Sequence, residues 1–417
     1  MTRALALTGL GLAGFLLPWL AFVSDRGIAW VTGGAAILSL PWLLRHRGAV
    51  KHALSRPVVW LGLAGLGAIT LLGLSSSLWT AVPEQAARVQ ELSVRSALAL
   101  VTAVPLVLLA LTLNGARTTV SRALACGIAV GLAIALFDFA SDHLALRIRE
   151  AIATNVATPD GIIAAARNLG SERFMTRFND FWVVMTLSMA VFVTAFRPGW
   201  LFPVTLLAFL VLSFLSISET SQLIGIIGVL VYVFCHLAGR AGVMVMALVT
   251  IGVLVSAPLL FPSINGLLLA SFDGSNLLEY KLLERFEIWA AVVDTVSSHP
   301  LLGHGLEFER LNATYNGPGN YYGVDHLWHP HSVFAQVWQD LGLLGVVATT
   351  ALILALHLAA ARAPNAQRAC ATALIAMSVG AFGAAHSIWL GWWICMFILV
   401  VTATIAGVRG RNGEKQA

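Results

Sequence analysis

Long apolar runs are the feature of this sequence that most restricts its fold. A helix of about 17–25 apolar residues is long enough to cross the hydrocarbon core of a bilayer, and the sequence contains twelve apolar runs of 16 to 28 residues. Hydrophobic residues make up 58% of the 417-residue chain and charged residues only 11%, whereas soluble domains have about 45–50% and about 25%. The sequence therefore predicts an all-α polytopic membrane protein with no large soluble catalytic domain.

The runs and their connections divide the chain into three parts. Residues 1–261 hold nine spans and a polar segment at 141–180, residues 262–332 form the largest connection, and residues 333–417 hold three spans and a tail. The first run resembles a signal peptide, but the second follows it after only a few residues, which favours a retained helix. The spans are predicted at 4–23, 28–44, 57–74, 96–113, 122–140, 181–196, 200–217, 222–238, 241–261, 333–360, 369–387 and 389–407.

The distribution of charge predicts the orientation. With a cytoplasmic N-terminus, the loops on that side hold fourteen of the 25 cations but a single acid, Glu414, whereas the other side holds nineteen of the 20 acids. Lys and Arg are enriched in short cytoplasmic loops, so we expect both termini in the cytoplasm. The longer connections, 75–95, 141–180 and 262–332, then lie on the opposite face. Because this insertion rule explains the basic loops, nucleic acid is not expected as a partner.

Few ionisable or metal-binding side chains lie within the predicted spans. Asp138 and Asp340 fall close to span ends, and His386 lies near an exit. Transporters commonly place ionisable residues at mid-span, so the pattern disfavours an ion-coupled transporter. All four cysteines lie in apolar runs without CxxC spacing, which argues against disulfides and thiolate metal sites: Cys126, Cys235, Cys370 and Cys395.

The largest connection contains a predicted amphipathic helix at 276–298. Asn276 and Glu279 have the spacing of a capping box. Five apolar residues fall on one face of this helix: Leu278, Leu282, Phe286, Trp289 and Val293. Arg285 lies on the shoulder of that face, where a guanidinium needs a partner. An outer-leaflet phosphate and the ordinary charges of a solvated face, such as Glu284, are the two alternatives.

Histidines surround the start of the tenth predicted span. His299 and His304 belong to a glycine-containing turn, and a second group lies within the seven residues 325–331: Asp325, His326, His329 and His331. Three histidines and an aspartate are compatible with a metal site. However, Pro330 fixes an extended link between two of them, and no helical HxxxH pattern is present. The pattern favours histidine as a base over histidine as a metal ligand.

The segment 141–180 carries five arginines on the face that is normally poor in cations: Arg147, Arg149, Arg167, Arg173 and Arg177. Four apolar residues form a narrow stripe beside the first two: Leu144, Ile148, Ala151 and Ile152. An interfacial helix with arginines at headgroup height is suited to an anionic lipid. Ordinary pairing with Asp142, Glu150 or Glu172 is the alternative.

The run at 331–345, HSVFAQVWQDLGLLG, resembles the signature of the O-antigen ligase and polymerase superfamily. The helix with Arg285 and Trp289 and the turn at 300–305, PLLGHG, resemble two further motifs of the family and occur in the family's order. Twelve spans with one large periplasmic loop before the last three match the ligase arrangement over most of the chain. The sequence departs from many relatives at Ser332, where they carry Asn, and at 218–222, where they carry Ser-Arg-Gly.

The resemblance implies a glycosyltransferase of the bacterial inner membrane with its active site on the periplasmic side. It would transfer a polysaccharide from undecaprenyl pyrophosphate to a sugar hydroxyl of lipid A-core, inverting the anomeric centre without nucleotide sugar, metal or cofactor. His331 would act as general base, and Arg285 would hold the leaving pyrophosphate. Further substrate contacts are expected from Arg147, Arg149, Arg173, Arg177, Lys281, Trp289, His304 and His329.

Three other functions stay open at this point. An O-antigen polymerase would use the same donor, although its relatives carry two comparable loops with arginine motifs. A protein O-oligosaccharyltransferase would usually have a longer periplasmic C-terminal region. A flippase for lipid-linked oligosaccharides would bind the same lipid without catalysis and would tolerate loss of His331. In each case we expect a monomer surrounded by membrane lipids.

Overall fold

The computed structural model describes residues 1–153, 171–197, 199–216, 218–275, 277–311, 330–383 and 386–414. Within these ranges the regular elements are α-helices and short 3-10 helices, and no strand is formed. Nine helical segments among the described residues are long and apolar enough to cross a membrane. The predicted all-α polytopic membrane fold is confirmed.

The helices follow one another with short connections. The first half of the chain contains α1 (Thr2–Val23), α2 (Asp25–Arg45), α3 (Arg47–Leu54), α4 (Pro57–Ser75), α5 (Ala86–Val101), α6 (Ala103–Thr112), α7 (Ala116–Ala140) and α8 (Leu144–Ala153). The second half contains α10 (Ser171–Phe196), α11 (Leu201–Ser216), α12 (Glu219–Ser271), α13 (Leu277–Asp294), α14 (Phe308–Leu311), α15 (Val333–Ala361), α16 (Asn365–Phe382) and α17 (Gly391–Glu414). The 3-10 helices are η1 (Ser76–Leu78), η2 (Pro83–Gln85) and η3 (Thr295–Ser298).

One helix covers two of the predicted spans. α12 is interrupted at Gly239, whose φ of 60° and ψ of −133° are not helical, and its two parts correspond to the spans predicted at 222–238 and 241–261. The spans predicted at 200–217 and 369–387 correspond to α11 and α16, which are not among the nine long apolar segments of the described residues. The number of twelve spans stays a prediction.

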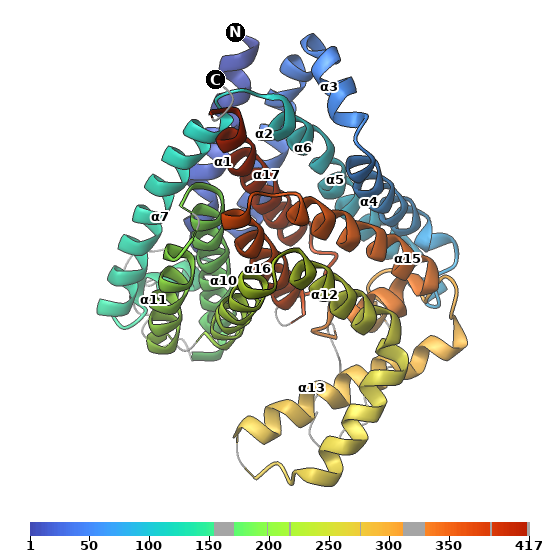
Figure 1. Ribbon diagram of the computed structural model, residues 1–417. Coiled ribbons are helices and arrows are strands. Elements are labelled where there is room, and N and C mark those ends of the chain that lie inside the picture. The colour runs from blue at the N-terminus through green and yellow to red at the C-terminus, as the bar shows by residue number, and fades with distance from the viewer. Residues whose placement is uncertain are drawn as a thin grey trace.

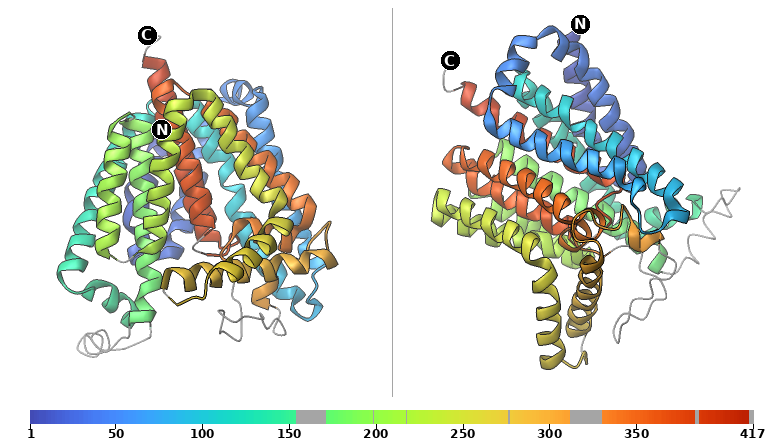
Figure 2. Two further views of the ribbon diagram at one scale, coloured as in Figure 1. Left: turned by 60° about the horizontal axis from the view of Figure 1, so that its bottom comes forward. Right: turned by 90° about the vertical axis from the view of Figure 1, so that its right-hand side faces the viewer.

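The connections gather at the two ends of the helical bundle. The start of α1 and the end of α17 lie at the same end (Figures 1 and 2). The opposite end carries η1, η2, α8, α13, η3 and α14, and we call it the site end. The charge distribution predicts that the site end faces away from the cytoplasm, and that orientation stays a prediction.

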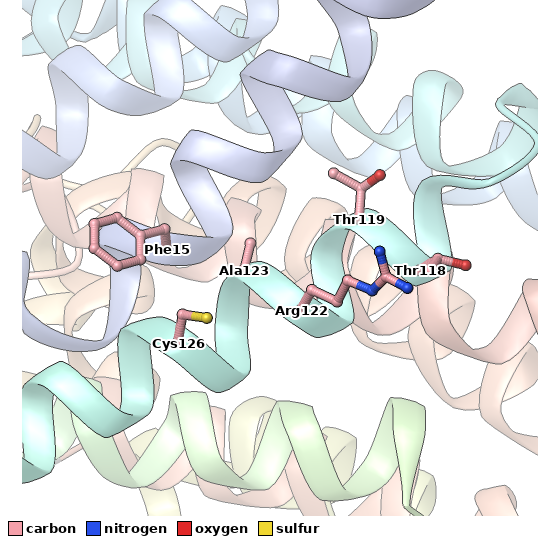
Figure 3. Close-up of a pocket in the computed structure, with 6 residues that line it drawn as sticks. All are labelled: Phe15, Thr118, Thr119, Arg122, Ala123 and Cys126. Carbon is pink, nitrogen blue, oxygen red and sulfur yellow. The ribbon is translucent and has the colours of Figure 1, made fainter.

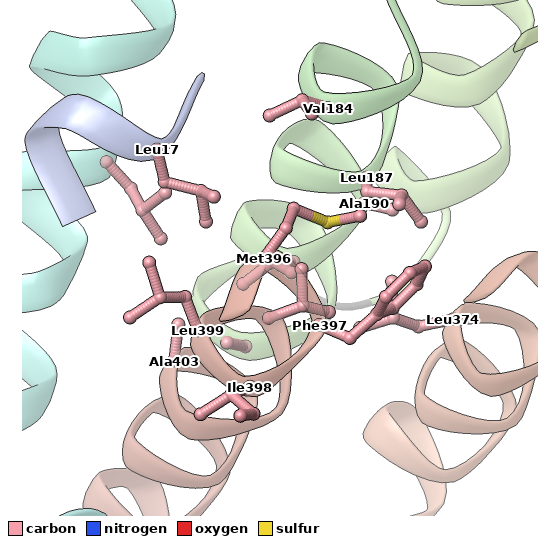
Figure 4. Close-up of a cluster of buried hydrophobic side chains, with 14 of the residues drawn as sticks. Leu17, Val184, Leu187, Ala190, Leu374, Met396, Phe397, Ile398, Leu399 and Ala403 are labelled. Carbon is pink, nitrogen blue, oxygen red and sulfur yellow. The ribbon is translucent and has the colours of Figure 1, made fainter. Parts of the chain in front are cut away.

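The centre of the bundle is formed by α10 and α17. Of their apolar segments 83% and 72% are buried, against 17% for the segment that begins with α4. Side chains of α1, α10, α16 and α17 meet in one core, among them Leu17, Leu187 and Met396 (Figure 4). Because lipid is as apolar as these side chains, association of the helices depends on close packing. Gly127 of α7 permits such packing, since a Cβ there would lie 2.2 Å from the carbonyl oxygen of Phe15 in α1.

The second part of α12 is longer than the span predicted there. The sequence predicts that this span ends at residue 261, but the helix continues to Ser271. Pro258 and Pro262 lie inside it and do not end it, and proline is a common cause of a bend in a helix. Figure 2 shows the last part of α12 turned away from the direction of the spans, with α13 folded back along it. The helix persists because α13 packs against it at Phe261.

We predict that Gly127→Ala lowers the thermal stability of the detergent-solubilised protein. Overpacking of a tight contact costs about 1–3 kcal/mol, which outweighs the gain of about 1 kcal/mol in helix propensity. Gly252→Ala is the matched control, because a Cβ at Gly252 meets nothing within 4 Å. Equal midpoints of thermal unfolding for the two variants would contradict the assigned contact between α1 and α7.

Candidate functional site

The site is built on a break in α15. Gly342 has a φ of 60°, which interrupts the helical hydrogen bonds of this helix. The amide groups of Leu343 and Leu344 donate to the carbonyl oxygens of Pro300 and Leu301, at 2.9 and 3.2 Å. In a continuous helix these two amides would donate to residues 339 and 340, four positions earlier. The break therefore frees two amides and two carbonyl groups on one side of α15.

The turn at 299–305 satisfies the two carbonyl groups as well. His304 donates its backbone N–H to Gln339 O at 2.7 Å, and Gly305 donates to Asp340 O at 3.1 Å. Four backbone hydrogen bonds thus replace those that the break removes. We call this arrangement, the turn 299–305 bound to residues 339–344, the clasp.

Glycine is required on both sides of the clasp. Gly303 and Gly342 both have positive φ, at 70° and 60°, a region that side chains with a Cβ rarely adopt. A Cβ on Gly303 would lie 2.5 Å from Gln339 O, and a Cβ on Gly342 would lie 2.6 Å from Gly303 N. The two glycine-containing motifs of the sequence are therefore the two halves of one structural unit.

A buried polar network lies beneath the clasp. Ser387 donates its hydroxyl to Glu307 and accepts a hydrogen bond of 2.9 Å from Gln336 Nε2. Trp389 Nε1 donates to the carboxylate of Asp340. Glu307 and Asp340 are only 1% and 0% exposed. The network joins the turn, α15 and the connection between α16 and α17, and it gives the buried carboxylates partners, as burial of such groups requires.

Two carboxyl groups next to the clasp favour the neutral form. Burial raises the pKa of Glu307, against a smaller opposing effect of the Ser387 hydrogen bond. Burial also raises the pKa of Glu309, and the neighbouring Asp340 adds to that rise. A nearly inaccessible carboxyl group that resists ionisation is poorly suited to accept a proton from a bulky substrate. These groups therefore belong to the frame of the site.

His331 precedes the first turn of α15 and lies beside α13. Ser332 caps the helix by accepting a hydrogen bond of 3.3 Å from Ala335 N. Trp289 of α13 donates its Nε1 to Pro330 O at 3.0 Å. His331 itself has a φ of 50°, unusual for a residue with a side chain, and is partly exposed. A helix cap on one side and α13 on the other thus fix the backbone of an accessible histidine.

The predicted amphipathic helix forms as α13 followed by η3. Phe286 and Trp289 pack against Phe261 of α12, with ring centroids 6.3 and 5.0 Å away. Residues four positions apart share one side of a helix, so Arg285 lies on the side of α13 that carries Trp289. The structure therefore brings together α13, which carries Arg285, and the start of α15, which His331 precedes.

Other predicted site residues have protein partners or lie outside the described residues. Lys281 forms an ion pair with Glu219, and Arg147 pairs with Asp142 at 3.3 Å. His304 is buried, with Nδ1 3.3 Å from Gln339 O. Arg173 and Arg177 lie in the first turns of α10, whose side chains are not described there, and His329 and Arg167 fall outside the described residues. The substrate contacts predicted for these residues stay predictions.

Arg149 connects α8 to the first two helices. Its guanidinium donates to Ala21 O at 3.0 Å and to Asp25 Oδ1 at 3.4 Å. The Arg147–Asp142 pair is one of the ordinary pairings that the sequence left open as the alternative to lipid binding, whereas the partners of Arg149 in α1 and α2 were not predicted. The first two arginines of the segment 141–180 therefore hold α8 in place whether or not they also meet a substrate.

The connection between α16 and α17 is the part of the site that the sequence did not reveal. His386 Nε2 forms a hydrogen bond with Asp180 of α10, and the adjacent Ser387 belongs to the network beneath the clasp. This connection thus links α10, which begins with Arg173 and Arg177, to α15. The only signal in the sequence is the polar pair at 386–387 between two apolar runs.

A cavity of about 550 Å³ lies between α1 and α7 (Figure 3). It is lined by Phe15, Thr118, Thr119, Arg122, Ala123 and Cys126. These residues belong to α1 and to the first turns of α7, which start from the end of the bundle that holds the termini. The cavity is therefore not part of the arrangement around His331.

Comparison with protein families identifies residues 182–350 as a match to the O-antigen ligase family. The matched region extends from α10 into α15 and includes α13, the clasp and His331. The resemblance found in the sequence motifs is confirmed for this region. A comparison with curated proteins gives no significant match.

We predict that His304 destabilises the fold as the pH falls. Burial, together with the nearby His299, lowers its pKa from 6.5 to about 4, so the folded protein favours the neutral ring. Its stabilising contribution is complete above pH 6.5 and is lost as the pH falls from 6.5 towards 4. His304→Gln should therefore show a smaller drop in melting temperature between pH 7.5 and 5 than the parent protein.

The exposed His52 of α3 provides the matched control. His52→Gln should retain the full drop in melting temperature. The raised pKa values of Glu307 and Glu309 favour folding at low pH. Both residues are present in the parent protein and in the two variants, so their effect cancels in the comparison. If His304→Gln loses as many degrees as the parent protein, His304 is not the responsible group.

Proposed function

We propose that this protein, whose residues 182–350 belong to the O-antigen ligase family, transfers a polysaccharide from undecaprenyl pyrophosphate to a sugar hydroxyl of lipid A-core. The family and the polytopic fold indicate a membrane enzyme of the glycosyltransferase type. The observation that carries the finer proposal is the position of His331 at the start of α15, next to the helix that bears Arg285. We place the reaction at the periplasmic face of a bacterial inner membrane.

In this proposal His331 is the general base. Its imidazole accepts the proton of the acceptor hydroxyl while the hydroxyl oxygen attacks the anomeric carbon of the donor. The bond between that carbon and the pyrophosphate oxygen breaks, and the pyrophosphate leaves on its lipid. A single displacement of this kind inverts the anomeric centre.

Arg285 stabilises the leaving group. Charge develops on the pyrophosphate as the glycosyl bond breaks, and a fixed guanidinium can stabilise it through paired hydrogen bonds. Arg173 and Arg177 are further candidates for the donor phosphates, because α10 is bonded through Asp180 to the connection next to the clasp. The side chains proposed for these two steps need neither metal nor nucleotide.

The surroundings of His331 support a catalytic role. A general base works best when its position is fixed before the substrate arrives, and here the cap by Ser332 and the hydrogen bond from Trp289 fix the backbone on both sides. Backbone conformations with positive φ in residues other than glycine cost free energy and cluster at functional sites. His331 is such a residue and is also open to solvent in part.

We predict that His331→Ala and Arg285→Ala fail to restore full-length lipopolysaccharide in a strain that lacks the gene. Loss of a general base typically lowers a rate by about 10²–10⁴-fold. Gel electrophoresis should show core-only lipopolysaccharide together with accumulated polymeric lipid-linked glycan. The controls are His52→Ala and Arg95→Ala, which change exposed residues of the same two types away from the clasp and should restore the full pattern.

The same gel separates the alternatives. Lipopolysaccharide cores that carry single repeats in the variants would indicate a polymerase. Full-length chains restored by His331→Ala would show that the base is assigned wrongly, and a flippase would behave in this way. Polymeric lipid-linked glycan that accumulates beside lipopolysaccharide cores without any repeat is the pattern expected from the loss of a ligase.

We further predict that the purified enzyme is insensitive to chelators. In the proposed mechanism the guanidinium of Arg285 provides the charge stabilisation that a divalent cation would otherwise supply. The transfer rate from a lipid-linked donor should therefore be the same with and without an excess of EDTA. A rate that falls on chelation and recovers with one added cation would contradict this mechanism.

A further inference from the structure

The end of α12 and α13 form a helical hairpin that extends sideways from the bundle at the site end. Figure 2 shows the hairpin from two directions, and in both it runs across the direction of the spans. The two helices are in contact along the hairpin. We call residues 258–294 the arm.

The first helix of the arm continues a membrane span without any charged residue. Arg240 is followed by 32 uncharged residues, 241–272, before Asp273 at the tip of the hairpin. A straight helix of that length measures about 48 Å, whereas the hydrocarbon core is about 30 Å thick. The excess length must therefore leave the core or lie along its surface. Figure 2 shows the last part of α12 turned across the direction of the spans, which favours a position along the surface.

The α12 side of the arm exposes large apolar side chains. Leu259 and Leu267 are 78% and 66% exposed, and Leu269 and Phe272 are also exposed. Phe261, by contrast, is buried against Phe286 and Trp289 of α13. The arm therefore has its own apolar interior, and a second apolar surface remains on its outside.

All of the arm's charged residues beyond the tip lie on α13. They are Glu279, Lys281, Glu284, Arg285, Glu287 and Asp294. Two antiparallel helices, of which one is uncharged and the other charged, give the arm an apolar side and a polar side. This division is typical of elements that lie in the interface between lipid and water.

We propose that the arm is immersed in the leaflet at the site end, with the outer surface of α12 among the acyl chains and the charged residues of α13 at the height of the headgroups. The partner is the bilayer itself, because the exposed leucines continue the uncharged, lipid-facing surface of the preceding span. If a second protein covered this surface, its continuity with the lipid-facing surface of the span would be unexplained, and none of the described residues indicates such a partner.

Immersion of the arm sets the height of Arg285. This consequence rests on the proposed function, in which the guanidinium binds a pyrophosphate carried by a lipid. Such a pyrophosphate lies at headgroup height, and the arm keeps α13 at that height on the flank of the bundle. The donor can then reach Arg285 and Trp289 by lateral diffusion in the leaflet.

The depth of the arm can be measured with single spin labels. Of the four cysteines, Cys126 is exposed and the other three are buried, so Cys126→Ala is the background for Leu267→Cys, Leu269→Cys and Asp294→Cys. Each variant is labelled with a nitroxide and reconstituted into vesicles of phosphatidylethanolamine and phosphatidylglycerol. Leu248→Cys, at an exposed position in the middle of the span, is the control for full immersion.

We expect labels at 267 and 269 to collide with oxygen, which dissolves in lipid, and to be shielded from a water-soluble nickel chelate, as the label at 248 is. The label at 294 should show the opposite preference. Access of nickel to the label at 267 would show that the arm lies in water, and shielding of that label from both reagents would show that protein covers it. Either result overturns the proposal.

A kinetic measurement connects the arm with the transfer reaction. Leu267→Asp should raise the KM for the lipid-linked donor several-fold in vesicles and leave kcat unchanged, because a carboxylate disfavours immersion. Leu267→Ala, which shortens the same side chain without adding a charge, is the control and should leave the KM close to that of the parent protein. An unchanged KM with an immersed arm would refute only its role in donor access. If the His331→Ala variant retains transfer activity while the spin labels show an immersed arm, the proposed function is refuted and the proposed position of the arm is not.

Discussion

The exchange of backbone hydrogen bonds between the turn at 299–305 and the broken helix α15 is the interaction on which the rest of the site depends. Gly342 breaks the helix, and the two amides and two carbonyl groups set free are satisfied by the turn. Without the turn, the backbone groups of α15 at the break would lack partners, and without the break the groups of the turn would lack them. A polar group that is left unpaired on burial costs about 1–3 kcal/mol. The first turns of α15, which start directly after His331, are thereby held to the segment that follows α13.

The buried network extends this connection to the remaining helices. Ser387 and Trp389 bind Glu307 and Asp340 respectively, and the neighbouring His386 binds Asp180 of α10. Segments that lie more than two hundred residues apart in the sequence are thus joined in one hydrogen-bonded unit. Burial raises the pKa of Glu307 and Glu309, so the negative charge of these two carboxyl groups is disfavoured beside a site that is proposed to bind a pyrophosphate.

The sequence predicted local features well and pairings poorly. Hydrophobic runs are long in a membrane protein, so they indicated the helices, and the spacing of Phe286 and Trp289 indicated α13. Whether Arg147 would meet a lipid or Asp142 depended on a contact that periodicity does not determine. The clasp and the Asp180–His386 pair join distant residues, and no local pattern encodes such pairing. The continuation of α12 past residue 261 was not predicted, because the length of an apolar run does not determine where its helix ends.

The clasp also restricts how such a protein can change in evolution. Cβ atoms on Gly303 and on Gly342 would each collide with the backbone of the opposite side of the clasp. Because the collision is with backbone atoms, a change of side chain on one side cannot compensate for a change on the other. We therefore expect these two positions to stay glycine while the residues around them vary.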